Sequence, residues 1–136
     1  LNNNKIKSIR NLIISLERLN DSQLNEFHKL LLYDNKIEIL DYGFSSNLKN
    51  LRILNLEYNR ISFIPKNFFS NLIFLIDLNL KFNPIIRLEP FCFSNLKSLN
   101  QLKLDYNFLT ELNDQNIFAG MSSLNSLHLS LSLIHI

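Results

Sequence analysis

Hydrophobic residues recur along the chain at a fixed spacing. Leu51, Leu54, Leu56 and Asn59 are followed by the same residue types one period later, and again after a second period of equal length. The equivalent sets are Leu75, Leu78, Leu80 and Asn83, then Leu99, Leu102, Leu104 and Asn107. A period of roughly 24 residues indicates units that bury their apolar faces only by stacking on one another. The pattern therefore predicts a solenoid.

Alternating leucines predict one short strand in each unit. In the stretch from Leu54 to Glu57, the leucines point into the core and the residues between them face solvent. Lateral stacking of such strands gives a parallel β-sheet on the concave side. An asparagine follows each strand, and its amide can satisfy backbone groups where the chain turns inward. We interpret this asparagine ladder as structural: Asn35, Asn59, Asn83 and Asn107.

Phenylalanines predict the opposite, convex wall of the core. Bulky rings suit this wide side, where we expect short helical or irregular turns. The column consists of Phe69, Phe93 and Phe118, with Phe44 as a fourth member. Cys92 stands directly before Phe93, as Phe68 stands before Phe69, so we expect a packed thiol rather than a nucleophile.

Two units are longer than the period. Asn4 and Asn35 lie farther apart than one period, and the extra residues lie near 11–24. Leucine and isoleucine have helical spacing there, which predicts a short convex helix; a ligand-engaging loop is the alternative. The unit from Leu99 to Leu124 contains a single extra residue, which fits a loop.

The last six residues depart from the pattern. The template requires asparagine at position 132, where the chain has Ser132. Residues 131–136 also match a translation of CTG-TCT-CTT-ATA-CAC-ATC, which resembles a transposon end used to tag sequencing libraries. We expect residues 1–130 to form about five repeats truncated at both ends, and residues 131–136 to be non-native.

The pattern Leu-x-x-Leu-x-Leu-x-x-Asn-x-Ile/Leu-x-x-Ile/Leu, followed by Phe-x-x-Leu, resembles the leucine-rich repeat family in its roughly 24-residue form. The resemblance extends from Leu24 to Leu129. It implies an α/β horseshoe with a parallel sheet on the concave face. Units with Phe-x-x-Leu and Ile64-Pro65 resemble extracellular members, namely Toll-like receptor or slit ectodomains and matrix proteins. The longer N-terminal unit instead resembles intracellular members.

Composition gives no indication of nucleic-acid binding or catalysis. Fourteen basic and 12 acidic residues leave a net charge of +2 without long runs, so we expect neither a nucleic acid nor a membrane surface as partner. No apolar run approaches the ~20 residues that span a bilayer. The three histidines have no metal-ligand spacing with Cys92 or with one another, and two glycines make no phosphate loop. We expect no metal, no cofactor and no enzymatic activity.

The concave face carries the candidate ligand-binding residues. One column across the strands, Glu57, Lys81 and Asp105, alternates in charge and is predicted to pair laterally or to meet a partner. The aromatic column beside it either supports the sheet edge or anchors a ligand. The candidates are Tyr33, Asn55, Glu57, Tyr58, Asn79, Lys81, Phe82, Lys103, Asp105 and Tyr106.

A rigid curved sheet with varied side chains suits a protein ligand or co-receptor better than a small molecule. With the family resemblance, this favours part of a cell-surface receptor ectodomain or a secreted matrix protein. The alternatives are an intracellular scaffold and the substrate-recruiting repeats of a larger enzyme. Asn20-Asp21-Ser22 is the one glycosylation sequon, which makes Asn20 a candidate for modification in the secretory pathway.

Overall fold

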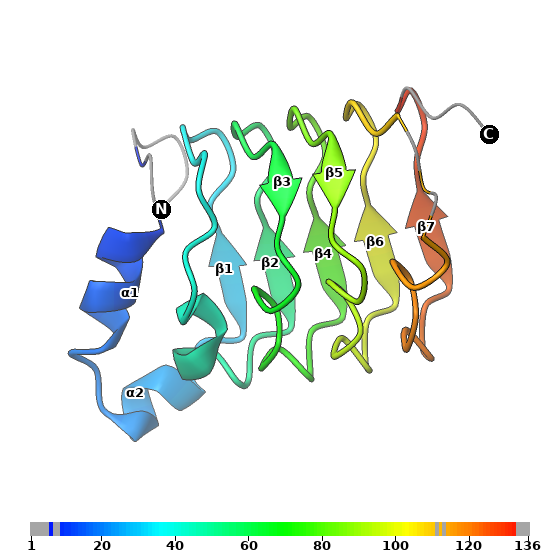
Figure 1. Ribbon diagram of the computed structural model, residues 1–136. Helices are drawn as coiled ribbons and strands as arrows, with labels where there is room; N and C mark the ends of the chain where they lie inside the picture. The colour runs from blue at the N-terminus through cyan, green and yellow to red at the C-terminus, as the bar shows by residue number, and fades with distance from the viewer. Residues whose placement is uncertain (1–5, 7–8, 111, 113, 133–136) are drawn as a thin grey trace.

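Five short parallel strands form the main sheet of the molecule. The computed structural model describes residue 6, residues 9–110, residue 112 and residues 114–132. The strands lie in the order β1 (Lys29–Leu31), β2 (Ile53–Asn55), β4 (Asp77–Asn79), β6 (Gln101–Lys103) and β7 (Ser126–His128) (Figure 1). Leu54 pairs in register with Leu30 of the preceding unit and with Leu78 of the following unit. The period of the sequence is therefore the period of the stack.

Four of the five three-residue strands, β1, β2, β4 and β6, bury one side chain each. Their central leucines at positions 30, 54, 78 and 102 are buried, and the flanking residues are half-buried or exposed. The predicted alternation and parallel sheet are confirmed. Leu127 in β7 is exposed, because no described unit covers its outer side.

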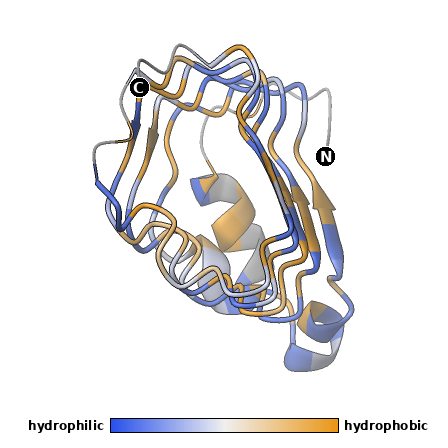
Figure 2. Cartoon of the chain, turned by 90° about the vertical axis from the view of Figure 1, so that its right-hand side faces the viewer, coloured by the Kyte–Doolittle hydropathy of each residue, from blue (hydrophilic) through white to orange (hydrophobic). Residues whose placement is uncertain are grey.

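The convex side consists of turns with little regular structure. A second, two-stranded parallel sheet joins β3 (Phe63–Ile64) to β5 (Arg87–Leu88), and a short 3₁₀ helix, η1, covers Phe44–Asn47. Figures 1 and 2 together place the small sheet and the main sheet on opposite sides of the core. Side chains from both sides fill the space between them.

Phenylalanine rings stack through the convex half of this core. Phe69, Phe93 and Phe118 form one column, with ring centroids 5.9 and 6.2 Å apart. The placement of Phe44 in that column is wrong. Its ring stacks on Phe68 at 4.8 Å instead, because Phe44 lies one full period before Phe68 and not before Phe69.

Cys92 follows Phe68 in this second column and is buried. Burial raises the pKa of its thiol to about 12, so the sulfur is protonated at neutral pH. A thiolate is the reactive species of cysteine, and the folded chain therefore protects this residue from thiol reagents. Its reactivity reports unfolding.

Two helices precede the first strand. The helix predicted near residues 11–24 is α1 (Arg10–Leu16), and a second helix, α2 (Asp21–Asn25), follows it. Figure 2 looks along the stack toward α1, which lies across its far end rather than on the convex face as expected. Ile9 and Ile13 are buried there. A helix in this position covers core side chains that the neighbouring unit leaves open.

Candidate functional site

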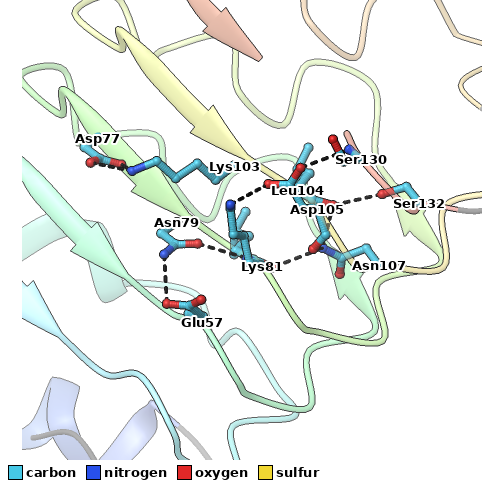
Figure 3. A network of polar contacts seen from close by, with 11 residues as sticks. Glu57, Asp77, Asn79, Lys81, Lys103, Leu104, Asp105, Asn107, Ser130 and Ser132 are labelled. Atoms are coloured by element: carbon cyan, nitrogen blue, oxygen red, sulfur yellow. Dashed lines mark hydrogen bonds and ion pairs between the residues drawn. The ribbon is translucent and has the colours of Figure 1, made fainter. Parts of the chain in front are cut away.

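The concave face carries a network of polar side chains, drawn in Figure 3. The ammonium of Lys103 bonds both carboxylate oxygens of Asp77, at 3.1 and 2.9 Å. Lys81 Nζ lies 2.9 Å from Asp105 Oδ2. Glu57 accepts a 3.1 Å hydrogen bond from the Asn79 amide. Side chains of neighbouring strands therefore satisfy one another across the sheet.

This geometry corrects the predicted charge column in part. Lys81 pairs laterally with Asp105 as expected. Glu57 does not form an ion pair with Lys81 among the described residues, because it bonds Asn79. Asp77 and Lys103 are likewise diagonal neighbours, since Lys103 lies opposite Asn79 in the register. Diagonal positions on adjacent strands are within reach of long side chains.

Asp105 is the most buried charge on this face, with 3% of its surface exposed. Its Oδ1 accepts a 2.9 Å hydrogen bond from the backbone N–H of Ser130. Burial opposes ionisation, but the bonds from Lys81 and Ser130 outweigh it, and the pKa of Asp105 falls below its ordinary 3.8. The carboxylate is thus ionised in the fold and ties the last described unit to the one before it.

Three aromatic rings lie side by side at the ends of the strands. Phe82 stacks between Tyr58 and Tyr106, with ring centroids 4.4 and 4.2 Å apart and nearly parallel planes. We call these three residues the aromatic stack. Tyr58 and Tyr106 are 52% and 45% exposed. Both faces of Phe82 and the inner face of each tyrosine are covered within the stack, and the two tyrosines keep about half of their surface exposed.

The backbone of the aromatic stack is left-handed. The φ angles of Tyr58, Phe82 and Tyr106 are 53°, 52° and 57°. For residues other than glycine, this backbone conformation costs roughly 1 kcal/mol of free energy. The turn is required because the next residue must point inward, and that residue is an asparagine of the ladder.

The ladder asparagines are buried and bond backbone groups of two successive units. Asn59 donates to the carbonyls of Leu56 and Leu32, at 3.0 and 2.9 Å, and accepts from the N–H of Ile37 at 3.0 Å. Asn83 and Asn107 repeat these contacts. At the position where the template requires asparagine, the Ser132 hydroxyl donates to the Leu104 carbonyl at 2.9 Å. Ser132 thus retains one bond of the ladder.

The remaining candidates lie on the same sheet. Tyr33 is half-buried, and Asn55 uses its side-chain oxygen to accept from the N–H of Glu57 at 2.9 Å. Sequence reasoning missed the exposed apolar residues Ile73, Phe74 and Ile76, which precede β4. A comparison of these positions between units would have found them, since the neighbouring units are polar there.

The described part of the chain shows neither a metal-binding cluster nor a membrane-spanning helix. Nowhere in this part of the chain do three histidine, cysteine, aspartate or glutamate side chains gather to hold a metal ion. None of the helices described is long and apolar enough to cross a membrane. Residues 133–136 of the predicted non-native segment lie outside the described residues.

Comparison with known proteins identifies the fold. A family model for the leucine-rich repeat matches residues 25–85 and 74–134, which together cover most of the chain. The chain belongs to the leucine-rich repeat family. This family is a non-enzymatic interaction fold. No curated protein sequence matches the chain.

Solved leucine-rich repeat structures share the architecture. An internalin (InlF) from Listeria monocytogenes is 30% identical, with a TM-score of 0.66, and the match covers 85% of this chain and 32% of the internalin. TLR13, solved with a single-stranded RNA, is 29% identical with a TM-score of 0.63, over 84% of this chain and 20% of the receptor. The ectodomain of the receptor kinase GASSHO1/SCHENGEN3 from Arabidopsis thaliana, in complex with CASPARIAN STRIP INTEGRITY FACTOR 2, is 22% identical. It shares the fold with a TM-score of 0.64, over 85% of this chain and 14% of its own length. The chain spans a third or less of each of these proteins.

Replacing Asp105 tests the buried ion pair. We expect Asp105→Asn to lower the free energy of unfolding by about 2 kcal/mol at pH 7, because Lys81 loses its counter-ion. The pKa of Asp105 is depressed in the fold, so its stabilisation is present above pH 3.8 and is lost as the pH falls below that value. Urea unfolding at pH 7 and pH 3 measures both. An equal difference between wild type and variant at the two pH values would show that the charge does not matter.

Two substitutions of Phe82 separate ring stacking from backbone strain. Phe82→Ala removes two stacked contacts and keeps the unfavourable backbone, so we expect a loss of about 2 kcal/mol. Phe82→Asn removes the same ring but tolerates positive φ, so the loss should be smaller by roughly 0.5–1 kcal/mol. Thermal and urea unfolding followed by circular dichroism measure the difference. Identical losses would show that position 82 carries no strain.

Proposed function

We propose that this leucine-rich repeat stack is a protein-recognition module that binds a protein ligand or co-receptor on its concave face. The observation that carries the proposal is the aromatic stack. The stack exposes about half of each of two tyrosines beside a polar sheet. Tyrosine is among the residue types that are enriched at the energetic hot spots of protein interfaces. The stack is already ordered, so a partner would not have to immobilise these side chains.

The paired charges around the stack support a protein ligand over a polyanion. Lys81 and Lys103 each lie against a carboxylate of the same sheet, and these ion pairs leave little local charge. Nucleic-acid binding depends on cations that are free to neutralise phosphates. In this proposal Glu57, Asn79 and the two ion pairs hold the surface in shape, and Tyr33, Asn55 and the aromatic stack contact the ligand.

The proposal places the module in a cell-surface receptor or a secreted protein without enzymatic activity of its own. The similarity to TLR13 and to an internalin supports this setting. The candidate acceptor Asn20 is exposed and precedes α2 as its N-cap, where Oδ1 accepts from the N–H of Gln23 at 2.9 Å. This bond does not use Nδ2, the atom that carries an N-linked glycan, so modification and capping are compatible.

Site-specific photocrosslinking tests the binding face. A benzophenone amino acid replaces Gln101 on the concave sheet or, as the matched control, exposed Asn95 on the convex side of the same unit. The full chain is displayed on cells and irradiated in the fluid that surrounds its source cells. We expect a protein adduct from position 101 and none from position 95. Tyr58→Ala and Tyr106→Ala should each reduce the adduct at least tenfold, because truncating a tyrosine that is a binding hot spot costs about 2 kcal/mol or more.

Two results would contradict this proposal. Equal adducts from both positions would remove the concave face as the binding surface. An adduct destroyed by nuclease and resistant to protease would replace the protein ligand with a nucleic acid.

Glycan analysis tests the proposed location. In protein isolated from its own cells, we expect peptide N-glycosidase to increase gel mobility, and Ser22→Ala to abolish that shift while leaving the Asn20 cap in place. Asn20→Asp also removes the acceptor but retains a good N-cap oxygen, which controls for helix stability. Identical mobility of wild type and Ser22→Ala, before and after enzyme treatment, would count against passage through the secretory pathway.

A further inference from the structure

One unit of the stack exposes three large apolar side chains where the chain approaches its strand. Ile73, Phe74 and Ile76 precede β4 and are 45%, 50% and 40% exposed. Leu72 and Leu75, interleaved with them, are fully buried and supply the core of this unit. The three exposed residues are therefore not needed to fill the core.

The neighbouring units are polar at the same positions. The preceding unit has Lys49, Asn50 and Arg52, and the following unit has Lys97, Ser98 and Asn100. All three units have the same backbone course, so the fold itself gives no reason for apolar residues in only one of them. Exposed apolar residues clustered in this way mark interaction surfaces.

Basic and imidazole side chains adjoin this apolar cluster along one edge of the sheet. The N–H of Ile76 donates to the carbonyl of Arg52, and the N–H of Arg52 donates to the carbonyl of His28, both at 2.8 Å. The three residues are thus lateral neighbours where the strands begin, at the lower edge of the sheet in Figure 1. We call this edge the strand-start rim. Phe74 lines a hollow of about 270 Å³ there with His28, Asn50 and Arg52.

The charge on the strand-start rim is unpaired, unlike that on the concave face. Among the described residues, the side chains of His28 and Arg52, which line this hollow, form no ion pair. An arginine side chain offers a planar fork of N–H donors that matches a carboxylate. An exposed arginine beside an exposed phenylalanine complements a group that is acidic on one side and apolar on the other.

We propose that the hollow at the strand-start rim binds a segment of a partner protein that carries a carboxylate next to a large apolar side chain. The carboxylate contacts the guanidinium of Arg52, and the apolar side chain packs on Phe74 and Ile76. This site lies where the strands begin, and the aromatic stack lies beyond their other end, so Arg52→Gln and Phe74→Ser test it without altering the residues proposed to contact the concave-face ligand.

Selection from a phage-displayed library of random peptides tests the site. The full chain is the target of the selection. A subtraction step on the double variant R52Q/F74S removes the peptides that bind elsewhere on the chain. We expect the enriched peptides to carry aspartate or glutamate close in sequence to leucine, phenylalanine or tryptophan. Fluorescence anisotropy then measures the affinity of one synthetic peptide for each variant. Arg52→Gln and Phe74→Ser should each weaken binding at least tenfold, and Lys97→Gln, on the rim of the next unit, should change it less than twofold.

A second measurement assigns the carboxylate to Arg52. Changing the acidic residue of the peptide to its amide should weaken binding to wild type tenfold and leave binding to Arg52→Gln unchanged. Protection of the Cys92 thiol in every variant shows that the chain is folded. Failure to enrich peptides, a basic or uncharged consensus, or insensitivity to Arg52→Gln would overturn the proposal. Self-association that Phe74→Ser abolishes would also overturn it, because the occupant would then be a second copy of the chain.

Discussion

Each turn of the stack depends on a buried amide that serves two units at once. The Asn59 side chain bonds the carbonyls of Leu56 in its own unit and Leu32 in the unit before, and accepts from Ile37. These backbone groups lie beyond the end of the strands, where the sheet can no longer pair them. A buried carbonyl or N–H without a partner costs about 1–3 kcal/mol. The asparagine therefore fixes both the turn of one unit and the distance to the next.

This requirement determines the surface next to it. To point asparagine inward, the preceding residue adopts a positive φ, and in three successive units that residue is aromatic. The rings are thereby aligned in one column, and their mutual stacking of roughly 0.5–1.5 kcal/mol per pair offsets the backbone cost. An exposed feature of the concave face is thus a direct consequence of a buried one. This coupling explains why the aromatic stack is ordered before any ligand arrives.

The features that repeat with the period could be predicted from the sequence. The features in which a side chain has more than one possible partner could not. The strands, the buried leucines and the Phe69 column follow from the period, because equivalent residues of stacked units become lateral neighbours. Grouping Phe44 with the Phe69 column is wrong, because the period itself places Phe44 beside Phe68. Glu57 had two partners within reach, Lys81 and Asn79, and side-chain geometry selected Asn79. The position of α1 lies outside the repeat, so periodicity says nothing about it.

The concave face and the strand-start rim differ in whether their charged side chains are already paired. On the concave face Lys81 and Lys103 are held by carboxylates of the same chain, so a ligand that sought those charges would first have to break an existing pair. At the strand-start rim Arg52 has no ion-pair partner among the described residues, and it adjoins Phe74, which the core does not use. A partner that binds an unpaired charge gains the whole interaction energy. A partner that binds a paired charge gains only the difference between the new interaction and the ion pair that it replaces. The concave face is therefore suited to recognition through aromatic and polar contacts, and the rim to recognition through charge.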